Sequence, residues 1–84
     1  MVESILEKMP EERLSYARHG MGNLTQREQQ VMRFVANAYS LKQTASELGL
    51  SPRTIEIYRS RVFSKLGARG SIDLVRIIAN LTSR

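Results

Sequence analysis

The stretch "ASELGLSPRTIEIYRSRVFSKLG", residues 45–67, decides the fold, because it holds two helix-stop signals and one helix-start signal. Gly49 and Gly67 are residues at which a helix readily ends in a left-handed conformation. Between them, Ser51 is a good N-cap, and Pro52 suits the first helical position, where its missing N–H costs nothing. The stretch therefore predicts a short helix that stops at Gly49 and a longer helix that stops at Gly67.

Helix-start signals also precede this stretch. Thr25 and Glu28 form the capping box T-x-x-E, and Ser40 and Gln43 form the related S-x-x-Q. Together with the apolar periodicity, the caps predict helices over about residues 25–38, 41–48, 52–66 and 72–81. No segment alternates as a strand would, so the predicted fold class is all-α.

The N-terminal part carries weaker signals. An amphipathic helix is predicted by apolar residues at helical spacing: Val2, Ile5, Leu6 and Met9. Pro10 ends that helix or starts another. The two glycines of "HGMGN", residues 19–23, indicate a linker. We therefore expect residues 1–23 to form a helical extension with a linker, and residues 24–84 to form the main domain.

The composition excludes several classes of site. The 84 residues contain no cysteine and a single histidine, His19, so neither disulfides nor a zinc site are expected. No apolar run approaches the ~18 residues of a membrane span, and Glu3 and Glu7 interrupt the apolar core that a signal peptide would need. No catalytic constellation is present. We expect a soluble, cytoplasmic protein that is not an enzyme, with no membrane attachment, cofactor, metal or small-molecule ligand.

The charge is distributed unevenly. The net charge of +5 divides into −1 over residues 1–24 and +6 over residues 25–84. Segment 51–69 holds five basic side chains and only one acidic one, Glu56. Such a concentration is typical of a protein that binds a polyanion, although a merely solvated face would also explain it.

The two helices around Gly49 have the spacing of a helix-turn-helix, in which a turn of about three residues joins them. Ala45 is small where the helices would cross most closely. On a helical wheel, Val62 and Leu66 share the inner side with Ile55. The opposite side carries two guanidinium groups, small hydroxyls and one apolar side chain: Arg53, Ile57, Ser60, Arg61 and Ser64. A face that enters the major groove needs such donors together with small residues.

Three segments carry a family resemblance: "LTQREQQVMRFVANAYS", "KQTASELGLSPRTIEIYRSRVFSKLGAR" and "SIDLVRIIANL". They resemble the four-helix DNA-binding domain of LuxR/FixJ/NarL-type bacterial transcription regulators, most closely the FixJ-like branch. Three positions depart from the pattern. Ala38 stands where glycine is frequent, Thr44 at a usually aliphatic core position, and Tyr58 where histidine is common. The polar Thr44 and bulky Tyr58 are expected to loosen or reshape the helix packing.

The resemblance makes residues 52–66 the recognition helix. It implies base contacts at Arg53, Glu56, Ile57 and Ser60, and phosphate contacts at Thr54, Arg61, Ser64 and Lys65. Glu56 would accept from a cytosine amino group or orient a neighbouring arginine, and Ile57 would contact a thymine methyl. Thr54 is alternatively only a helix N3 residue. Arg59 points nearer the core and is expected to pair with Glu28.

The last predicted helix has two apolar arcs. One consists of Ile72, Val75 and Ala79, and the other of Leu74, Ile77, Ile78 and Leu81. The first arc is expected to pack on the core, and the resemblance makes the second a dimer seam. A helix buried on all sides is the alternative. A two-fold dimer would place recognition helices about 34 Å apart on a pseudo-palindromic site.

These observations predict a sequence-specific regulator that binds double-stranded DNA as a homodimer, with RNA polymerase or a partner regulator as further partners. One alternative is a module that docks a partner regulator through the same scaffold. Another is a sigma-factor region that contacts the −35 promoter element, against which "KLGAR" and the apolar last helix argue. The N-terminal residues would be either the end of a linker from a receiver domain, as in a response regulator output domain, or the start of a standalone regulator.

Overall fold

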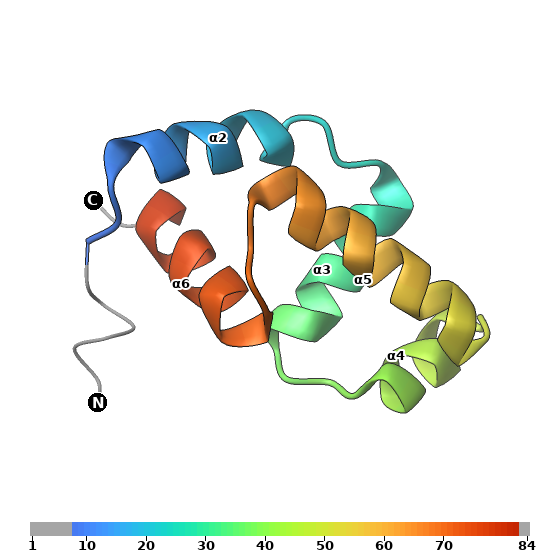
Figure 1. Cartoon of the computed structure of the whole chain (residues 1–84). Coiled ribbons are helices and arrows are strands. Elements are labelled where there is room, and N and C mark those ends of the chain that lie inside the picture. The colour runs from blue at the N-terminus through green and yellow to red at the C-terminus, as the bar shows by residue number, and fades with distance from the viewer. Residues whose placement is uncertain (1–7, 83–84) are drawn as a thin grey trace.

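The computed structural model describes residues 8–82, and within these residues the chain forms five helices and no strand (Figure 1). The helices are α2 (Glu11–Met21), α3 (Gln26–Ala36), α4 (Leu41–Leu48), α5 (Pro52–Leu66) and α6 (Ser71–Thr82). The predicted all-α fold class is confirmed. The predicted helix that begins at Val2 falls mainly on residues 1–7, outside the described part, whereas Pro10 is the N-cap of α2.

The helix ends form as the local signals predict. The Glu28 N–H donates to Thr25 Oγ1 at 3.1 Å, and the Thr25 N–H donates to Glu28 Oε1 at 2.9 Å, which completes the capping box of α3. Ser40 caps α4 in the same way, and the Ser51 hydroxyl caps α5. Gly49 ends α4 in a left-handed conformation with φ of 67°. These contacts are local in sequence, which is why the sequence predicts them.

Helix α5 lies at the centre of the fold, and the other four helices all pack against it (Figure 1). Its side chains Ile55, Val62 and Leu66 are at most 1% exposed, so the predicted inner face is confirmed. They join buried side chains from α3, α4, α6 and the loop before α3: Leu24, Val31, Val35, Ala45 and Leu74. The opposite side of α5 is left at the surface.

Helix α2 is packed on this core. Its Leu14 and Ala17 form a second apolar cluster with Met9 and with Ile77 of α6. The prediction of a linker is wrong for residues 19–21, which form the last turn of α2. The misleading signal was Gly20, which is buried because α2 approaches α5 closely at this point. The division of the chain at residue 24 stays a prediction.

The two arcs of α6 are oriented opposite to the prediction. Leu74 and Ile77, which were assigned to a dimer seam, are both fully buried within the chain, and Ile78 and Leu81 are half-buried. The assignment of Leu74 and Ile77 to a surface is therefore wrong. Ile72, which was expected on the core side, is 73% exposed. The physical reason is that α6 is covered on two sides, by α3 and α5 at Leu74 and by α2 at Ile77.

Two of the three departures from the family pattern have a structural account here. Ala38 has a left-handed backbone with φ of 66°, the conformation that glycine adopts most easily. Thr44 is 1% exposed, and its hydroxyl donates to the Ser40 carbonyl at 2.8 Å, so the buried oxygen is satisfied. Thr44 is therefore accommodated inside the core by a hydrogen bond to the N-cap residue of its own helix.

Candidate nucleic-acid interface

A rigid turn sets the angle between α4 and α5. The Leu50 N–H donates to the Ala45 carbonyl at 3.0 Å, which closes the C-terminal end of α4 around Gly49. Ala45 is itself buried, in the same core cluster as Ile55 of α5. Ser51 then starts α5 at once. The predicted helix-turn-helix is present, and it leaves the outer face of α5 directed to solvent.

The outer face of α5 brings the predicted base contacts together. A shallow surface hollow is lined by Arg53, Glu56, Ile57, Ser60 and Arg61. All five side chains are exposed, including the apolar Ile57 at 43%. Two guanidinium groups, one carboxylate, one small hydroxyl and one aliphatic group thus share a single surface. This mixture of donors, an acceptor and an apolar contact suits the edges of base pairs.

Arg61 lies against an aromatic side chain. Its guanidinium carbon is 5.8 Å from the centroid of the Tyr58 ring, within the range of a cation–π contact. Tyr58 is one of the departures from the family pattern, and it is half-buried. The ring therefore restricts the Arg61 side chain at the edge of the hollow before any ligand binds. This reduces the conformational entropy that Arg61 would lose on binding.

The predicted phosphate contacts differ in their surroundings. Ser64 is exposed one turn beyond Ser60, and its carbonyl accepts from the Tyr16 hydroxyl at 3.2 Å. Thr54 is half-buried, and its hydroxyl lies 2.9 Å from that of Ser51. Both hydroxyls keep additional hydrogen-bonding capacity.

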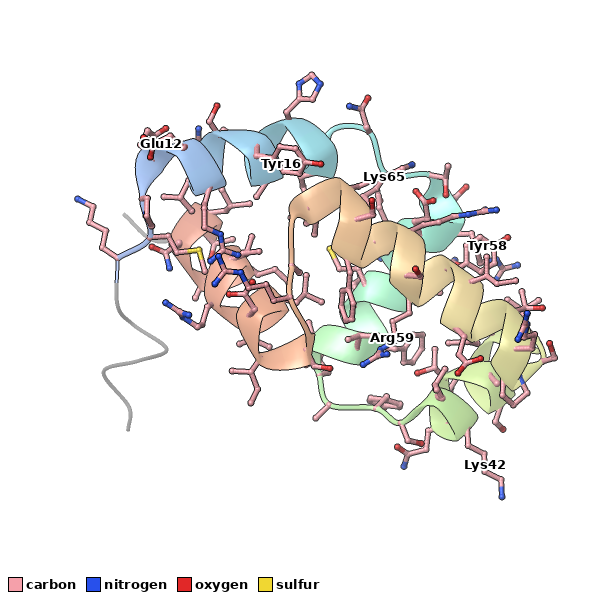
Figure 2. The ribbon with its side chains drawn as sticks, viewed as in Figure 1. Glu12, Tyr16, Lys42, Tyr58, Arg59 and Lys65 are labelled. Atoms are coloured by element: carbon pink, nitrogen blue, oxygen red, sulfur yellow. The ribbon has the colours of Figure 1, made fainter. Side chains whose placement is uncertain are left out.

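Lys65 is held within the fold. Its Nζ donates to Glu28 Oε1 at 2.7 Å and to the Asn23 carbonyl at 3.0 Å, which uses two of its three donors. Figure 2 labels Lys65 on α5. The predicted pairing of Glu28 with Arg59 is wrong. Arg59 instead lies over the Phe63 ring, 4.7 Å from its centroid, and donates to the Ser71 hydroxyl at 3.2 Å.

Glu28 is a buried carboxylate whose charge is compensated. Its side chain is 3% exposed. The hydrogen bond from Lys65 and the one from the Thr25 N–H lower the pKa of Glu28 below its ordinary value, and burial opposes this only in part. Glu28 is therefore ionised at neutral pH and anchors Lys65 at the C-terminal end of α5.

A short helix, a tight turn and a longer helix with an exposed basic face define a helix-turn-helix protein of the DNA-binding class. The chain belongs to the luxR family of bacterial regulatory proteins, whose family model matches residues 22–78. The matched segment is the DNA-binding domain of transcription regulators, and this is not an enzyme family. The resemblance that the sequence motifs indicated is confirmed.

Curated relatives support the assignment. FixJ of Azorhizobium caulinodans, a transcriptional regulatory protein, is 42% identical over 57 residues, covering 68% of this chain and 27% of that protein. Nodulation protein W of Bradyrhizobium diazoefficiens is 47% identical over 58 residues, covering 69% of this chain and 26% of that protein. Response regulator protein TodT of Pseudomonas putida is 38% identical over 69 residues, covering 82% and 30%. No solved structure matches the chain.

These matched segments cover less than a third of each relative. Within residues 8–82, no helix combines the length and apolarity needed to cross a membrane. The same residues contain no cluster of three or more His, Cys, Asp or Glu side chains that could hold a metal ion.

Proposed function

We propose that this chain is a sequence-specific double-stranded DNA-binding transcription regulator that inserts α5 into the major groove. The observation that carries the proposal is the exposed hollow on α5, where the candidate base contacts lie together: Arg53, Glu56, Ile57 and Ser60. Arg61 at its edge would hold a phosphate, with the hydroxyls of Ser64 and Thr54 and the remaining donor of Lys65 as secondary phosphate contacts. The net charge of +6 over residues 25–84 would attract the duplex.

We further propose that the protein binds as a homodimer on a pseudo-palindromic site. The face of α6 that the rest of the described chain leaves open contains the exposed Ile72 and the half-buried Val75 and Ala79. A second copy would cover this apolar face and place two α5 helices in successive major grooves. RNA polymerase or a partner regulator would bind elsewhere. Relatives named as response regulators favour a role as the output domain of such a regulator.

The Arg61→Ala substitution tests the binding mode. Loss of one phosphate contact should weaken binding to all duplexes and reduce the slope of log affinity against log salt by about one. Affinity is measured by fluorescence anisotropy over about 50–300 mM salt, on a duplex of about 20 base pairs selected by the wild-type protein from a random pool. Arg18→Ala, which removes the same charge from the exposed side of α2, is the matched control and should leave the slope unchanged.

An unchanged affinity and salt slope for Arg61→Ala would exclude this residue as a phosphate contact. If the wild-type protein selects no duplex from the pool, the proposed function is wrong, and a module that docks a partner protein becomes the favoured alternative.

A further inference from the structure

Helix α2 contacts the C-terminal end of the recognition helix and lies wholly before the segment that the family model matches, residues 22–78. The closest approach is at Gly20, where a Cβ atom would overlap the Lys65 carbonyl. Glycine destabilises the interior of a helix by about 1 kcal/mol relative to alanine, so helix formation does not account for it. The close packing of α2 on α5 does account for the glycine at position 20.

Two side chains of α2 donate hydrogen bonds at the same place. The Tyr16 hydroxyl donates to the Ser64 carbonyl at 3.2 Å, and the Tyr16 ring lies directly against Gly67. Arg13 donates to the Gly67 carbonyl at 3.1 Å. The last four carbonyls of a helix have no partner within it. The Ser64 carbonyl also accepts from the Gly67 N–H at 3.3 Å. Tyr16 thus adds a second donor within the last turn of α5, and Arg13 supplies one to the residue that ends the helix.

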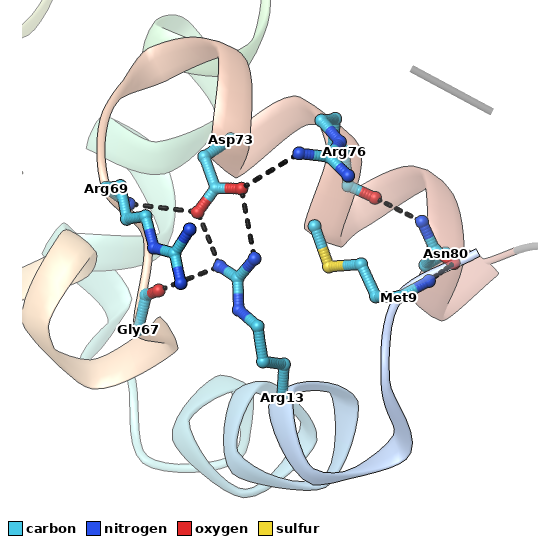
Figure 3. A network of polar contacts seen from close by, with 7 residues as sticks. All are labelled: Met9, Arg13, Gly67, Arg69, Asp73, Arg76 and Asn80. Atoms are coloured by element: carbon cyan, nitrogen blue, oxygen red, sulfur yellow. Dashed lines mark hydrogen bonds and ion pairs between the residues drawn. The ribbon is translucent and has the colours of Figure 1, made fainter. Parts of the chain in front are cut away.

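Arg13 also links this helix end to α6. Its guanidinium donates to both carboxylate oxygens of Asp73, at 2.5 and 3.3 Å (Figure 3). Asp73 also accepts from the Arg69 N–H at 3.0 Å, so the loop between α5 and α6 is tied to the same group. Just before α2, at the same end as Arg13, the Met9 N–H donates to the Asn80 side chain at 3.2 Å, whereas Gly20 packs on α5 near the C-terminal end of α2. The contacts fix α2 at both ends.

Along α5, these contacts begin where the proposed DNA face ends. Ser64, whose carbonyl accepts from Tyr16, is itself a candidate phosphate contact, and Arg61 lies less than one turn before it. The position of both side chains on the duplex depends on the direction of the last turns of α5. A helix tied to that end by Gly20, Tyr16 and Arg13 therefore controls where they lie.

We propose that α2 is a positioning element for the recognition helix. In this inference, which rests on the proposed function, Arg13, Tyr16 and Gly20 touch no DNA and raise affinity by holding the C-terminal half of α5 in its binding orientation. Functional groups must be held to within about 0.5 Å by their supporting residues. Removing the support should therefore lower affinity without removing a phosphate contact.

The experiment compares full-length Arg13→Ala with Arg18→Ala. Both remove one positive charge from α2, but within residues 8–82 Arg18 pairs only with the exposed Glu11 of its own helix, at 3.4 Å. On the duplex selected by the wild-type protein, we expect Arg13→Ala to lose about three- to ten-fold in affinity at an unchanged salt slope, with Arg18→Ala within about two-fold of wild type. Binding to a scrambled duplex should change less. Amides of the last turn of α5 should exchange faster with solvent in Arg13→Ala only.

Tyr16→Phe provides the second variant, because it removes only the hydroxyl and keeps the ring on Gly67. Circular dichroism should show that this variant stays folded. Its affinity for the selected duplex should fall by less than that of Arg13→Ala, at the same unchanged salt slope. Arg13→Lys, which keeps a donor and a charge, should restore part of the affinity.

Three results would overturn the inference. The first is wild-type affinity in both Arg13→Ala and Tyr16→Phe. The second is a salt slope reduced by about one in Arg13→Ala, which would make Arg13 a direct phosphate contact. The third is an equal loss in Arg18→Ala. In each case the wild-type protein still selects a duplex, so the proposed function survives; failure of that selection is the separate result that would reject it.

Discussion

Ala38 carries a backbone conformation that a Cβ atom makes unfavourable. With φ of 66° it lies in the left-handed region, which costs a residue other than glycine about 1–2 kcal/mol. Its side chain is exposed, so no packing would be lost on its removal. The nearby Ala36 is the last residue of α3 and therefore has a helical backbone. The two alanines can be compared because Ala38 is exposed with a positive φ, whereas Ala36 is half-buried in a helical backbone.

Ala38→Gly should raise the free energy of unfolding by about 0.5–1 kcal/mol, because the relief of strain exceeds the extra freedom that glycine has in the unfolded chain. That gain corresponds to a rise in Tm of several degrees in a domain of this size. Ala36→Gly should instead lower the free energy of unfolding by about 0.5–1 kcal/mol. Thermal unfolding of both variants checks the pair. Equal destabilisation by the two substitutions would mean that Ala38 is not strained.

Lys65 serves stability first. Lys65→Met should lower the free energy of unfolding by about 1–3 kcal/mol, because the buried Glu28 carboxylate loses its cation. In a Glu28→Gln background the same substitution should cost less, since the neutral amide needs no counter-charge. Urea unfolding of the four proteins gives the coupling energy. A coupling energy of zero would show that the Lys65–Glu28 pair contributes nothing to stability. Arg61→Ala is the control, and it should leave the free energy of unfolding unchanged.

At the scale of single helices, the sequence predicts starts and stops well because capping is local. Ser51 and Gly67 sit within a few residues of the groups they bind, so α5 is predicted at both ends. The outer face of α5 is also predictable, since Ile55 and its partners define the inner one. Contacts between helices are different. The partner of Glu28 depends on how α3 crosses α5, and no local pattern encodes that crossing.

Helix α6 shows the same limit, because both of its arcs are apolar. Which arc faces the core depends on the packing of α2. The sequence does not predict that packing, because the two glycines of "HGMGN" indicate a linker instead. The structure therefore changes the test for the proposed dimer. A charge at the fully buried Leu74 would unfold the monomer, so it cannot report on association.

Ile72→Glu is the informative substitution, because Ile72 is 73% exposed. We expect the variant to keep the helical content and Tm of the wild-type protein within a few degrees, to sediment as a monomer, and to bind the selected duplex at least about ten-fold more weakly, through loss of the second half-site. Leu74→Glu is expected to lose its cooperative unfolding transition. A folded Ile72→Glu variant that still dimerises would exclude this face as the seam.

At the scale of the whole molecule, two ion pairs hold the helices around α5. Lys65–Glu28 joins α5 to α3, and Arg13–Asp73 joins α2 to α6, the latter shown in Figure 3. Burial raises the pKa of Asp73, but the hydrogen bonds from Arg13 and the Arg69 N–H outweigh it, so the net shift is downward. The pKa of Glu28 is also lowered. Two carboxylates, Glu28 and Asp73, thus hold the helices around the recognition helix together, and both ion pairs require the ionised carboxylate.

The sign of the pH dependence follows from these shifts. A carboxyl group whose pKa is lower in the folded than in the unfolded chain stabilises the fold above its ordinary pKa, and this contribution is lost as the pH falls through the folded-state value. Wild-type Tm should therefore fall as the pH drops below about 4, where Asp and Glu ordinarily titrate. Glu28→Gln and Asp73→Asn should each be less stable than wild type at neutral pH. Each difference should shrink below about pH 4, because protonation makes the wild-type carboxyl resemble the amide. Thermal melts of the three proteins from about pH 7 to pH 3 measure the differences, and curves that stay parallel throughout would show that neither carboxylate couples folding to protonation.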